Sequence, residues 1–194
     1  MEEDLSRKGI QEVLFSASAV RSSDKFPLTV TLSAVPEGSL AHSDLTELKE
    51  KGLIAWDLPL KASQYMTPVS NFEHMLQCVV YYGNAEKGRS CIGFALGCIN
   101  KENTAIELNF IEKRSDAGDD FKSKFLPIIV DAFTLYALYL NEREDANISK
   151  FVIMGPLEQV IPYYKTSGFI YQNDYNGSGA DALYKELCEQ KVDN

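Results

Sequence analysis

The pattern of apolar and polar residues along the middle of the chain predicts three β-strands. Residues 76–82 are rich in Val and Tyr, residues 91–99 are almost wholly apolar, and residues 104–112 alternate apolar with polar residues. Short polar segments of the kind found in turns separate them. The pattern therefore predicts a three-stranded antiparallel meander. In its third strand, one face is expected to carry Ile106, Leu108 and Phe110, and the other Glu107, Asn109 and Ile111.

Beyond residue 120 the period becomes that of a helix. Apolar residues recur there at i, i+3, i+4 and i+7, namely Phe133, Tyr136, Ala137 and Leu140. This spacing predicts a long helix to about residue 142 with one buried stripe. Pro127 either lies in the first turn of a helix that begins near residue 124 or kinks a longer helix. A short buried strand, a helix, a strand, and a final strand or helix are expected next, over residues 149–155, 157–166, 169–172 and 183–187.

The first 75 residues give less regular signals. Four segments are distinguishable: a strand or helix over 10–20, a strand over 26–35, a helix over 45–51 and an irregular stretch over 53–70. Ser43 or Asp44 is the expected N-cap of the helix, and Gly52 is expected to end it. We expect this part of the chain to complete the sheet and to cover one side of a cleft.

Three short motifs accompany this order of elements. Residues 92–97 read Ile-Gly-Phe-Ala-Leu-Gly, residues 105–112 form the next strand, and residues 163–169 read Tyr-Tyr-Lys-Thr-Ser-Gly-Phe. Together they resemble the GNAT superfamily of N-acetyltransferases. In that family the strand that corresponds to residues 105–112 opens onto acetyl-CoA, and a helix ends in the motif Tyr-x-x-x-Gly-Phe. The resemblance covers residues 76–175.

This resemblance implies a fold and a domain organisation. The expected class is α/β (α+β), with a GNAT-like mixed, mostly antiparallel central sheet flanked by helices. Residues 1–194 would form a single GNAT-like domain. Within it, residues 1–75 would be a divergent N-terminal part and residues 76–175 the acetyl-CoA-binding core.

The resemblance also implies roles in moving an acetyl group from acetyl-CoA, the expected co-substrate, to an amine. Tyr164 stands where the family has a tyrosine that protonates the CoA thiolate. Glu107 is the expected general base for the amine, and Asn109 on the same strand face is expected to bind the acceptor. Backbone groups that would hold the pantetheine arm and the thioester carbonyl belong to Phe110, Ile111 and Glu112.

Structural explanations compete with these roles. Tyr164 would serve equally well as an amphipathic core residue, although Tyr163 is the expected core residue of the pair. Alternating polar residues on a strand commonly face solvent, and this is the simpler reading of Glu107 and Asn109.

The segment between the third strand and the long helix departs from the family. Members usually have Arg or Gln there, then two residues and Gly-x-Gly or Gly-x-Ala, whose backbone N–H groups hold the pyrophosphate. If Arg114 opens that motif, Ala117 and Asp119 replace its two glycines. The loop is therefore degenerate, and the residues expected to meet the pyrophosphate are Arg114, Ser115 and Gly118.

Composition narrows the class of protein further. Acidic residues outnumber basic ones 28 to 19, for a net charge of -9 without any basic run, which argues against nucleic-acid binding. No stretch reaches the roughly 20 apolar residues of a membrane span. The acidic residues after Met1 lead us to expect no secretory signal. The 4 cysteines form no C-x-x-C pair and no metal-ligand pattern. Buried reduced thiols and a cytoplasmic location, with no metal, are expected.

Three functions fit these observations. The first is an acyltransferase acting on a small-molecule or peptide amine, for which the negative charge favours a cationic acceptor. The second is a catalytically degenerate GNAT-fold protein that acts as a protein-binding or regulatory module. The third is an acidic inhibitor or nucleic-acid mimic, suggested by charge alone. A homodimer is compatible with the first reading. The enzyme is expected to have an open cleft between strands 104–112 and 151–155. The binding module is expected to have this cleft filled by side chains.

Overall fold

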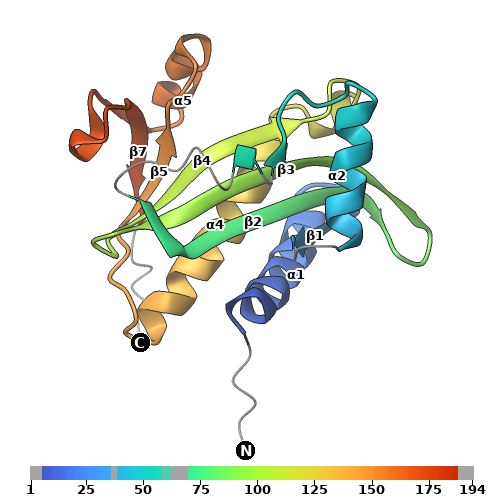
Figure 1. The fold of residues 1–194 in the computed structure, drawn as a ribbon, viewed down its shortest axis with the longest axis horizontal. Coiled ribbons are helices and arrows are strands. Elements are labelled where there is room, and N and C mark those ends of the chain that lie inside the picture. Colours follow the sequence, from blue (N-terminus) through green and yellow to red (C-terminus); the bar gives the residue numbers. More distant parts are fainter. Residues whose placement is uncertain (1–5, 36–38, 59, 62–69, 188–194) are drawn as a thin grey trace, which may run out of the picture.

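The computed structural model describes residues 6–35, 39–58, 60–61 and 70–187. The strands of this part of the chain are β1 (Val30–Ala34), β2 (Ser70–Asn84), β3 (Gly88–Asn100), β4 (Ala105–Lys113), β5 (Lys150–Met154), β6 (Ile170–Gln172) and β7 (Ala182–Glu186). Its α-helices are α1 (Arg7–Lys25), α2 (Leu40–Glu50), α4 (Phe125–Glu142) and α5 (Ile161–Thr166). Figure 1 shows how they are arranged.

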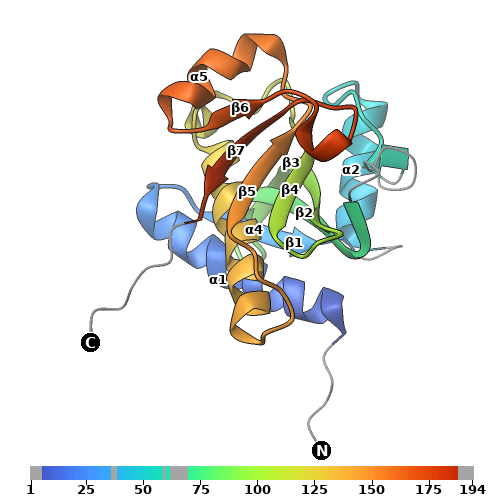
Figure 2. The same ribbon diagram turned by 90° about the vertical axis from the view of Figure 1, so that its left-hand side faces the viewer.

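The strands form a single sheet in the order β1-β2-β3-β4-β5-β7-β6. Neighbouring strands are antiparallel except for the parallel pair β4 and β5 at the centre. Helices α1 and α4 lie against one face of the sheet and α2 lies against the other, as both views show (Figures 1 and 2). The mixed, mostly antiparallel sheet flanked by helices that the sequence predicts is confirmed.

The predicted meander is present, with longer strands than the alternation indicates. β2, β3 and β4 pair in succession as antiparallel neighbours. β1 adds to this sheet at the outer edge of β2, in register from Val30 opposite Tyr82 to Ala34 opposite Cys78. The N-terminal part therefore completes the sheet as expected.

A β-bulge in β4 changes which face its side chains occupy. Gly97 of β3 pairs with Leu108, but the preceding Leu96 pairs with Phe110, so Asn109 has no partner on β3. A strand with one extra residue reverses its alternation beyond that point. Ile111 therefore packs on the α4 side and Phe110 on the α2 side. The prediction that Phe110 shares a face with Ile106 and Leu108 is wrong.

Helix α4 is the core helix on its face of the sheet. Its buried residues are Phe125, Ile128, Ile129, Ala132, Phe133, Tyr136, Ala137 and Leu140, which include the predicted stripe. Pro127 is the third helical residue, so it lies in the first turn, where a missing N–H breaks no helical hydrogen bond. By length and composition α4 is the one helix among the described residues that would suffice to cross a membrane, but a core helix of a soluble protein passes the same test.

Of the two readings for residues 10–20 the helix is observed, and both N-terminal helices are longer than the sequence indicates. Residues 10–20 belong to the longer helix α1, whose N-cap Ser6 accepts a hydrogen bond from the N–H of Gly9. Helix α2 begins earlier than predicted, because its N-cap is Ser39 and not Ser43 or Asp44. Gly52 follows its C-terminal end with a φ of 66°, as predicted. Of the predicted irregular stretch over 53–70, residues 59 and 62–69 lie outside the described residues.

The C-terminal elements confirm the predicted order. β5 is buried, α5 is preceded by a short 3-10 turn at Glu158–Val160, and β6 follows Gly168, whose φ is 85°. Of the two readings for residues 183–187, the strand is observed as β7. Three cysteines, Cys78, Cys91 and Cys98, are buried free thiols as expected, and the predicted reduced thiol at Cys188 lies outside the described residues.

Candidate functional site

The central parallel strands separate halfway along β4. They pair from Ala105 opposite Lys150 to Leu108 opposite Ile153. β5 then ends, and Gly155 turns the chain away with a φ of 54°. β4 continues to Lys113 with only β3 beside it in the described sheet. Backbone groups of residues 109–113 therefore line an open gap, and the bulge at Asn109 lies where that gap begins.

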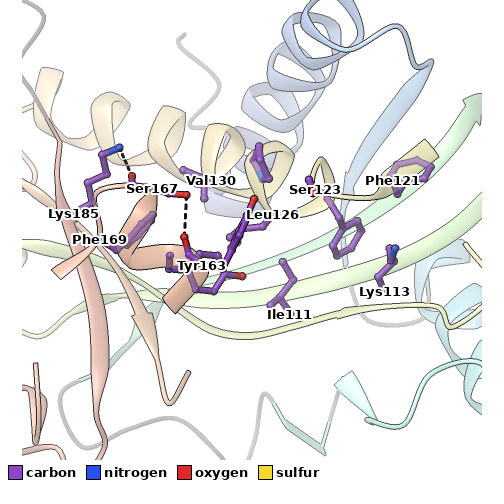
Figure 3. A pocket seen from close by; sticks show the side chains of 13 residues that line it. Ile111, Lys113, Phe121, Ser123, Leu126, Val130, Tyr163, Ser167, Phe169 and Lys185 are labelled. Atoms are coloured by element: carbon purple, nitrogen blue, oxygen red, sulfur yellow. Dashed lines mark hydrogen bonds between the residues drawn. The ribbon is translucent and has the colours of Figure 1, made fainter. Parts of the chain in front are cut away.

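A pocket of about 510 Å³ lies on the α4 side of this gap. Figure 3 shows Ile111 on the strand side, Leu126 and Val130 on the helix side, and Tyr163 and Phe169 closing one end. The lining comprises Ile111, Lys113, Phe121, Ser123, Phe125, Leu126, Pro127, Val130, Tyr163, Tyr164, Ser167, Phe169 and Lys185. It is mainly apolar with a few polar groups, which is the composition of a small-molecule site.

Tyr164 lines this pocket from α5. Its ring contacts the rings of Tyr163 and Phe169, with centroids 5.3 and 5.8 Å away. Burial, with a smaller effect from Tyr163, raises the pKa of Tyr164. The hydroxyl therefore keeps its proton at neutral pH and is able to donate it. Tyr163 is the more exposed of the two, at 54%, so the expectation that it is the core residue of the pair is wrong.

Glu107 and Asn109 lie on the opposite face of the sheet from α4. Glu107 is fully buried, so the simpler expectation that it faces solvent is wrong. Its Oε2 accepts hydrogen bonds from Ser70 Oγ at 3.2 Å and from Cys98 Sγ at 3.4 Å. Burial raises the pKa of Glu107. The pKa of Tyr175 is raised to about 12, mainly by the burial of Tyr175 itself and secondly by the charge of Glu107.

Two atoms of this buried polar group have no hydrogen-bond partner among the described residues. They are Oε1 of Glu107, an acceptor, and Nδ2 of Asn109, a donor. Oδ1 of Asn109 lies 3.6 Å from Cys98 Sγ and is the alternative acceptor for the one proton of that thiol. Buried polar atoms are rarely left without a partner, so this pair indicates a place for a ligand or a bound water molecule beside the bulge.

The three residues expected to hold a pyrophosphate are engaged elsewhere or lie outside the pocket lining. The guanidinium of Arg114 donates to both carboxylate oxygens of Asp116, at 2.5 and 2.9 Å, and to Ser90 Oγ at 3.2 Å. The N–H of Ser115 donates to the carbonyl of Leu53 at 3.0 Å. Gly118 lies in the exposed part of this loop with a φ of 75°. Their role in pyrophosphate binding stays a prediction.

Other groups suited to an anion do line the pocket, and the sequence-based reasoning did not select them. Lys113 ends β4, Ser123 precedes α4, and Lys185 comes from β7. The first N–H groups of α4, at Phe125 and Leu126, have no acceptor within the helix. A serine and a lysine just before an apolar helical pattern are a sequence signal for a helix start, and that signal was available.

A short segment after α2, Ala55 and Trp56, covers part of β4 on the α2 side. The carboxylate of Glu112 accepts hydrogen bonds from the backbone N–H groups of Ala55 at 2.7 Å and Trp56 at 2.9 Å. The Trp56 ring contacts the Phe110 ring edge to face, with centroids 5.2 Å apart. The side chain of Glu112 therefore fixes this segment over β4, whereas the sequence-based role concerned its backbone.

Within the residues that the structure describes, no three His, Cys, Asp or Glu side chains form a group able to hold a metal ion. Tyr164, Glu107, Asn109 and the backbone amides of β4 are the groups near the gap that the sequence selected.

Comparison with known proteins gives similarity at the level of solved structures. No protein-family model and no curated protein sequence matches the chain. Ard1 from Thermoplasma volcanium is 14% identical with a TM-score of 0.40, over 82% of this chain and 99% of that one. Naa50 from Arabidopsis thaliana, solved with a bisubstrate analogue, is 13% identical with a TM-score of 0.44, over 82% and 100%. An aminoglycoside 6'-N-acetyltransferase from Enterococcus faecium is 10% identical with a TM-score of 0.43, over 82% and 98%. Because all three TM-scores are below 0.5, the function proposed below depends on the site of this chain and not on these matches.

Proposed function

We propose that this protein is an acyltransferase that moves an acetyl group from acetyl-CoA to a primary amine. The observation that carries the proposal is the gap between β4 and β5 beyond Leu108 and Ile153, with an apolar pocket on one side and a buried carboxyl on the other. A gap in a sheet lets a thioester on one face meet an amine on the other. The backbone edge of residues 109–113 is available to bind the amides of a pantetheine arm.

The pocket suits the donor in its lining as well as its position. An extended pantetheine chain lying along Ile111 would direct its thioester toward Tyr164 and its phosphates toward the start of α4. There Lys113 and Ser123, with the first N–H groups of α4, supply positive charge and hydrogen-bond donors. This arrangement replaces the Arg114 loop as the anion site.

The chemistry needs one base and one acid. Glu107, ionised, takes a proton from the ammonium form of the acceptor, directly or through a water molecule between Oε1 and the amine. The amine nitrogen then forms a bond to the acetyl carbon, and the bond from that carbon to sulfur breaks. Tyr164 gives its proton to the departing thiolate, and its raised pKa keeps that proton in place until then.

The acceptor class follows from charge. The chain has a net charge of -9, and its candidate base is a buried carboxylate. Both features attract a cationic amine, either a small molecule or a peptide, and disfavour an anionic acceptor.

Calorimetry with acetyl-CoA tests the donor half of the proposal, and release of CoA thiol in the presence of a panel of amines tests the transfer. We expect acetyl-CoA to bind and at least one cationic amine to accelerate thiol release. Ile111→Glu should abolish binding because it places a charge in the apolar pocket, whereas Glu86→Gln, in the exposed turn between β2 and β3, should bind as the parent does. An absence of binding at high micromolar acetyl-CoA would contradict the proposal.

A second candidate, a protein-binding module on the same fold, is favoured by the pairing of Arg114 with Asp116. That pairing removes the cation expected to hold the pyrophosphate. The two candidates differ in the effect of Lys113→Ala. It should weaken acetyl-CoA binding in the enzyme and change nothing measurable if the pocket binds no nucleotide.

A further inference from the structure

A lysine from the chain after α2 lies over two aromatic rings that contact each other beside β4. The Nζ atom of Lys61 is 5.0 Å from the centroid of the Trp56 ring and 4.8 Å from the centroid of the Phe110 ring. An ammonium group within about 6 Å of two ring faces is attracted by both quadrupoles. The Trp56 and Phe110 rings therefore form an aromatic site that binds a primary alkylammonium, and Lys61 supplies one.

The backbone N–H groups of Lys61 and of its neighbour Leu60 are both hydrogen-bonded. The N–H of Lys61 donates to the carbonyl of Asp57, and the N–H of Leu60 to Asp57 Oδ1, both at 2.9 Å. Upstream, the N–H groups of Ala55 and Trp56 donate to the Glu112 carboxylate. Both ends of this short segment are thus hydrogen-bonded, and one end is bonded directly to β4.

The amine of Lys61 lies on the face where the proposed transfer needs its acceptor. Phe110 projects to the α2 side, whereas its neighbour Ile111 lines the donor pocket on the α4 side. Both residues belong to the part of β4 that β5 no longer covers. The buried carboxyl of Glu107 is on the same face as the Phe110 ring. A thioester that crosses the gap therefore emerges beside the ring that contacts Lys61.

We propose that Lys61 is an acetyl acceptor of this protein's own site, so that the chain acetylates itself at this residue. This inference rests on the proposed function. The ammonium of Lys61 loses one proton to Glu107, and its nitrogen forms an amide bond to the acetyl carbon. The bond between carbon and sulfur breaks, and Tyr164 protonates the CoA thiolate. Acetyllysine and CoA are the products, and no oxidant or reductant is needed.

Acetylation has a structural consequence at the same place. The amide carries no charge, so the attraction between Nζ and the two rings is lost. The ring faces of Trp56 and Phe110 that attract Lys61 would then attract the ammonium group of another molecule. The same aromatic pair accordingly indicates a lysine-like alkylamine as the class of external acceptor.

The test is a time course of the purified full chain with acetyl-CoA, followed by intact mass and by peptide mapping of each lysine. We expect one acetyl group per chain at Lys61, formed at a rate independent of protein concentration. It should form at least about tenfold faster than at Lys87, a lysine in the exposed turn between β2 and β3, because a positioned amine reacts at a high effective concentration. Excess CoA should suppress acetylation of Lys61 and leave Lys87 unchanged. Lys61→Arg keeps the charge and should bind acetyl-CoA normally without gaining the acetyl group.

The outcomes separate this inference from the proposed function. Equal acetylation of Lys61 and Lys87, or acetylation of Lys61 that CoA does not suppress, would indicate uncatalysed chemistry and overturn the inference. Acetyl-CoA binding by calorimetry with Lys61 unmodified would overturn the inference and leave the acyltransferase proposal standing. If acetyl-CoA does not bind at all, both proposals fail.

Discussion

Replacing Glu107 by glutamine separates catalysis from stability at the candidate site. The Glu107 side chain is fully buried, Oε2 accepts two hydrogen bonds, and Oε1 has no partner among the described residues. Glutamine has the same shape, keeps an acceptor oxygen for Ser70 and Cys98, and carries no charge. We therefore expect Glu107→Gln to abolish transfer and to fold at least as stably as the parent near neutral pH.

The size of both effects follows from the surroundings of Glu107. Leaving a buried group without its hydrogen bond costs about 1–3 kcal/mol, and more when the group is charged. Since the neutral amide carries a smaller penalty than the carboxylate, we expect Glu107→Gln to raise the free energy of unfolding by about 1 kcal/mol. Removing a general base lowers kcat by about 10²–10⁴.

The pH dependence has a definite sign. Burial raises the pKa of Glu107 above its ordinary value. Between the ordinary and the raised value, the folded chain holds a proton that the unfolded chain releases. The contribution of Glu107 to the free energy of unfolding therefore falls as pH rises through this window. The stability advantage of Glu107→Gln should grow from acidic toward neutral pH, and the parent's kcat/KM should rise over the same window as the base ionises.

Urea unfolding at several pH values and the thiol-release assay measure these quantities. Glu102→Gln is the matched control, because Glu102 is exposed in the turn before β4. It should change the free energy of unfolding by less than about 0.5 kcal/mol and leave transfer intact. If Glu107→Gln loses more than about 2 kcal/mol at neutral pH, the carboxylate is a stabilising partner and the reasoning is refuted. Transfer at the parent's rate would refute its role as the base.

Four other substitutions give three further tests. Tyr164→Phe should lower kcat by about 10²-fold with little change in acetyl-CoA affinity, because only the proton donor is removed; a normal kcat would exclude that role. Gly97→Ala should destabilise the fold by about 1–3 kcal/mol in urea, since its Cβ would lie 2.6 Å from the Phe133 ring; an unchanged midpoint would contradict the packing. Arg114→Ala should leave acetyl-CoA affinity unchanged by calorimetry, because the guanidinium of Arg114 is paired with an aspartate. Lys113→Ala should weaken that affinity. A larger loss of affinity for Arg114→Ala than for Lys113→Ala would indicate that the Arg114 loop is the anion site.

The order of the elements was predictable because each element has its own local pattern. Val and Tyr content, an apolar run and alternation predicted β2, β3 and β4 in turn, and apolar spacing predicted the buried stripe of α4. Turn chemistry was equally local, as the left-handed backbone at Gly52 and Gly168 indicates. These features depend on residues within a few positions of one another, so a sequence contains them in full.

The faces of β4 were not predictable, because a bulge is decided by the neighbouring strand. Nothing in residues 105–113 signals that Asn109 will lack a partner on β3. A single extra residue sent Phe110 and Ile111 to faces opposite to those the alternation predicts. The same long-range pairing places Ser70 and Cys98 around Glu107 and encloses a residue that the sequence suggests is exposed.

The sequence by itself determined the kinds of elements, their order and a shortlist of reactive side chains, because helix and strand periods and turn residues act locally. Only the tertiary structure decided where β4 and β5 separate, which side chains reach that gap, and that Arg114 is paired with Asp116 and not directed into the pocket. These outcomes depend on contacts between residues distant in the chain, and the energies of such contacts are set by burial and by strand register.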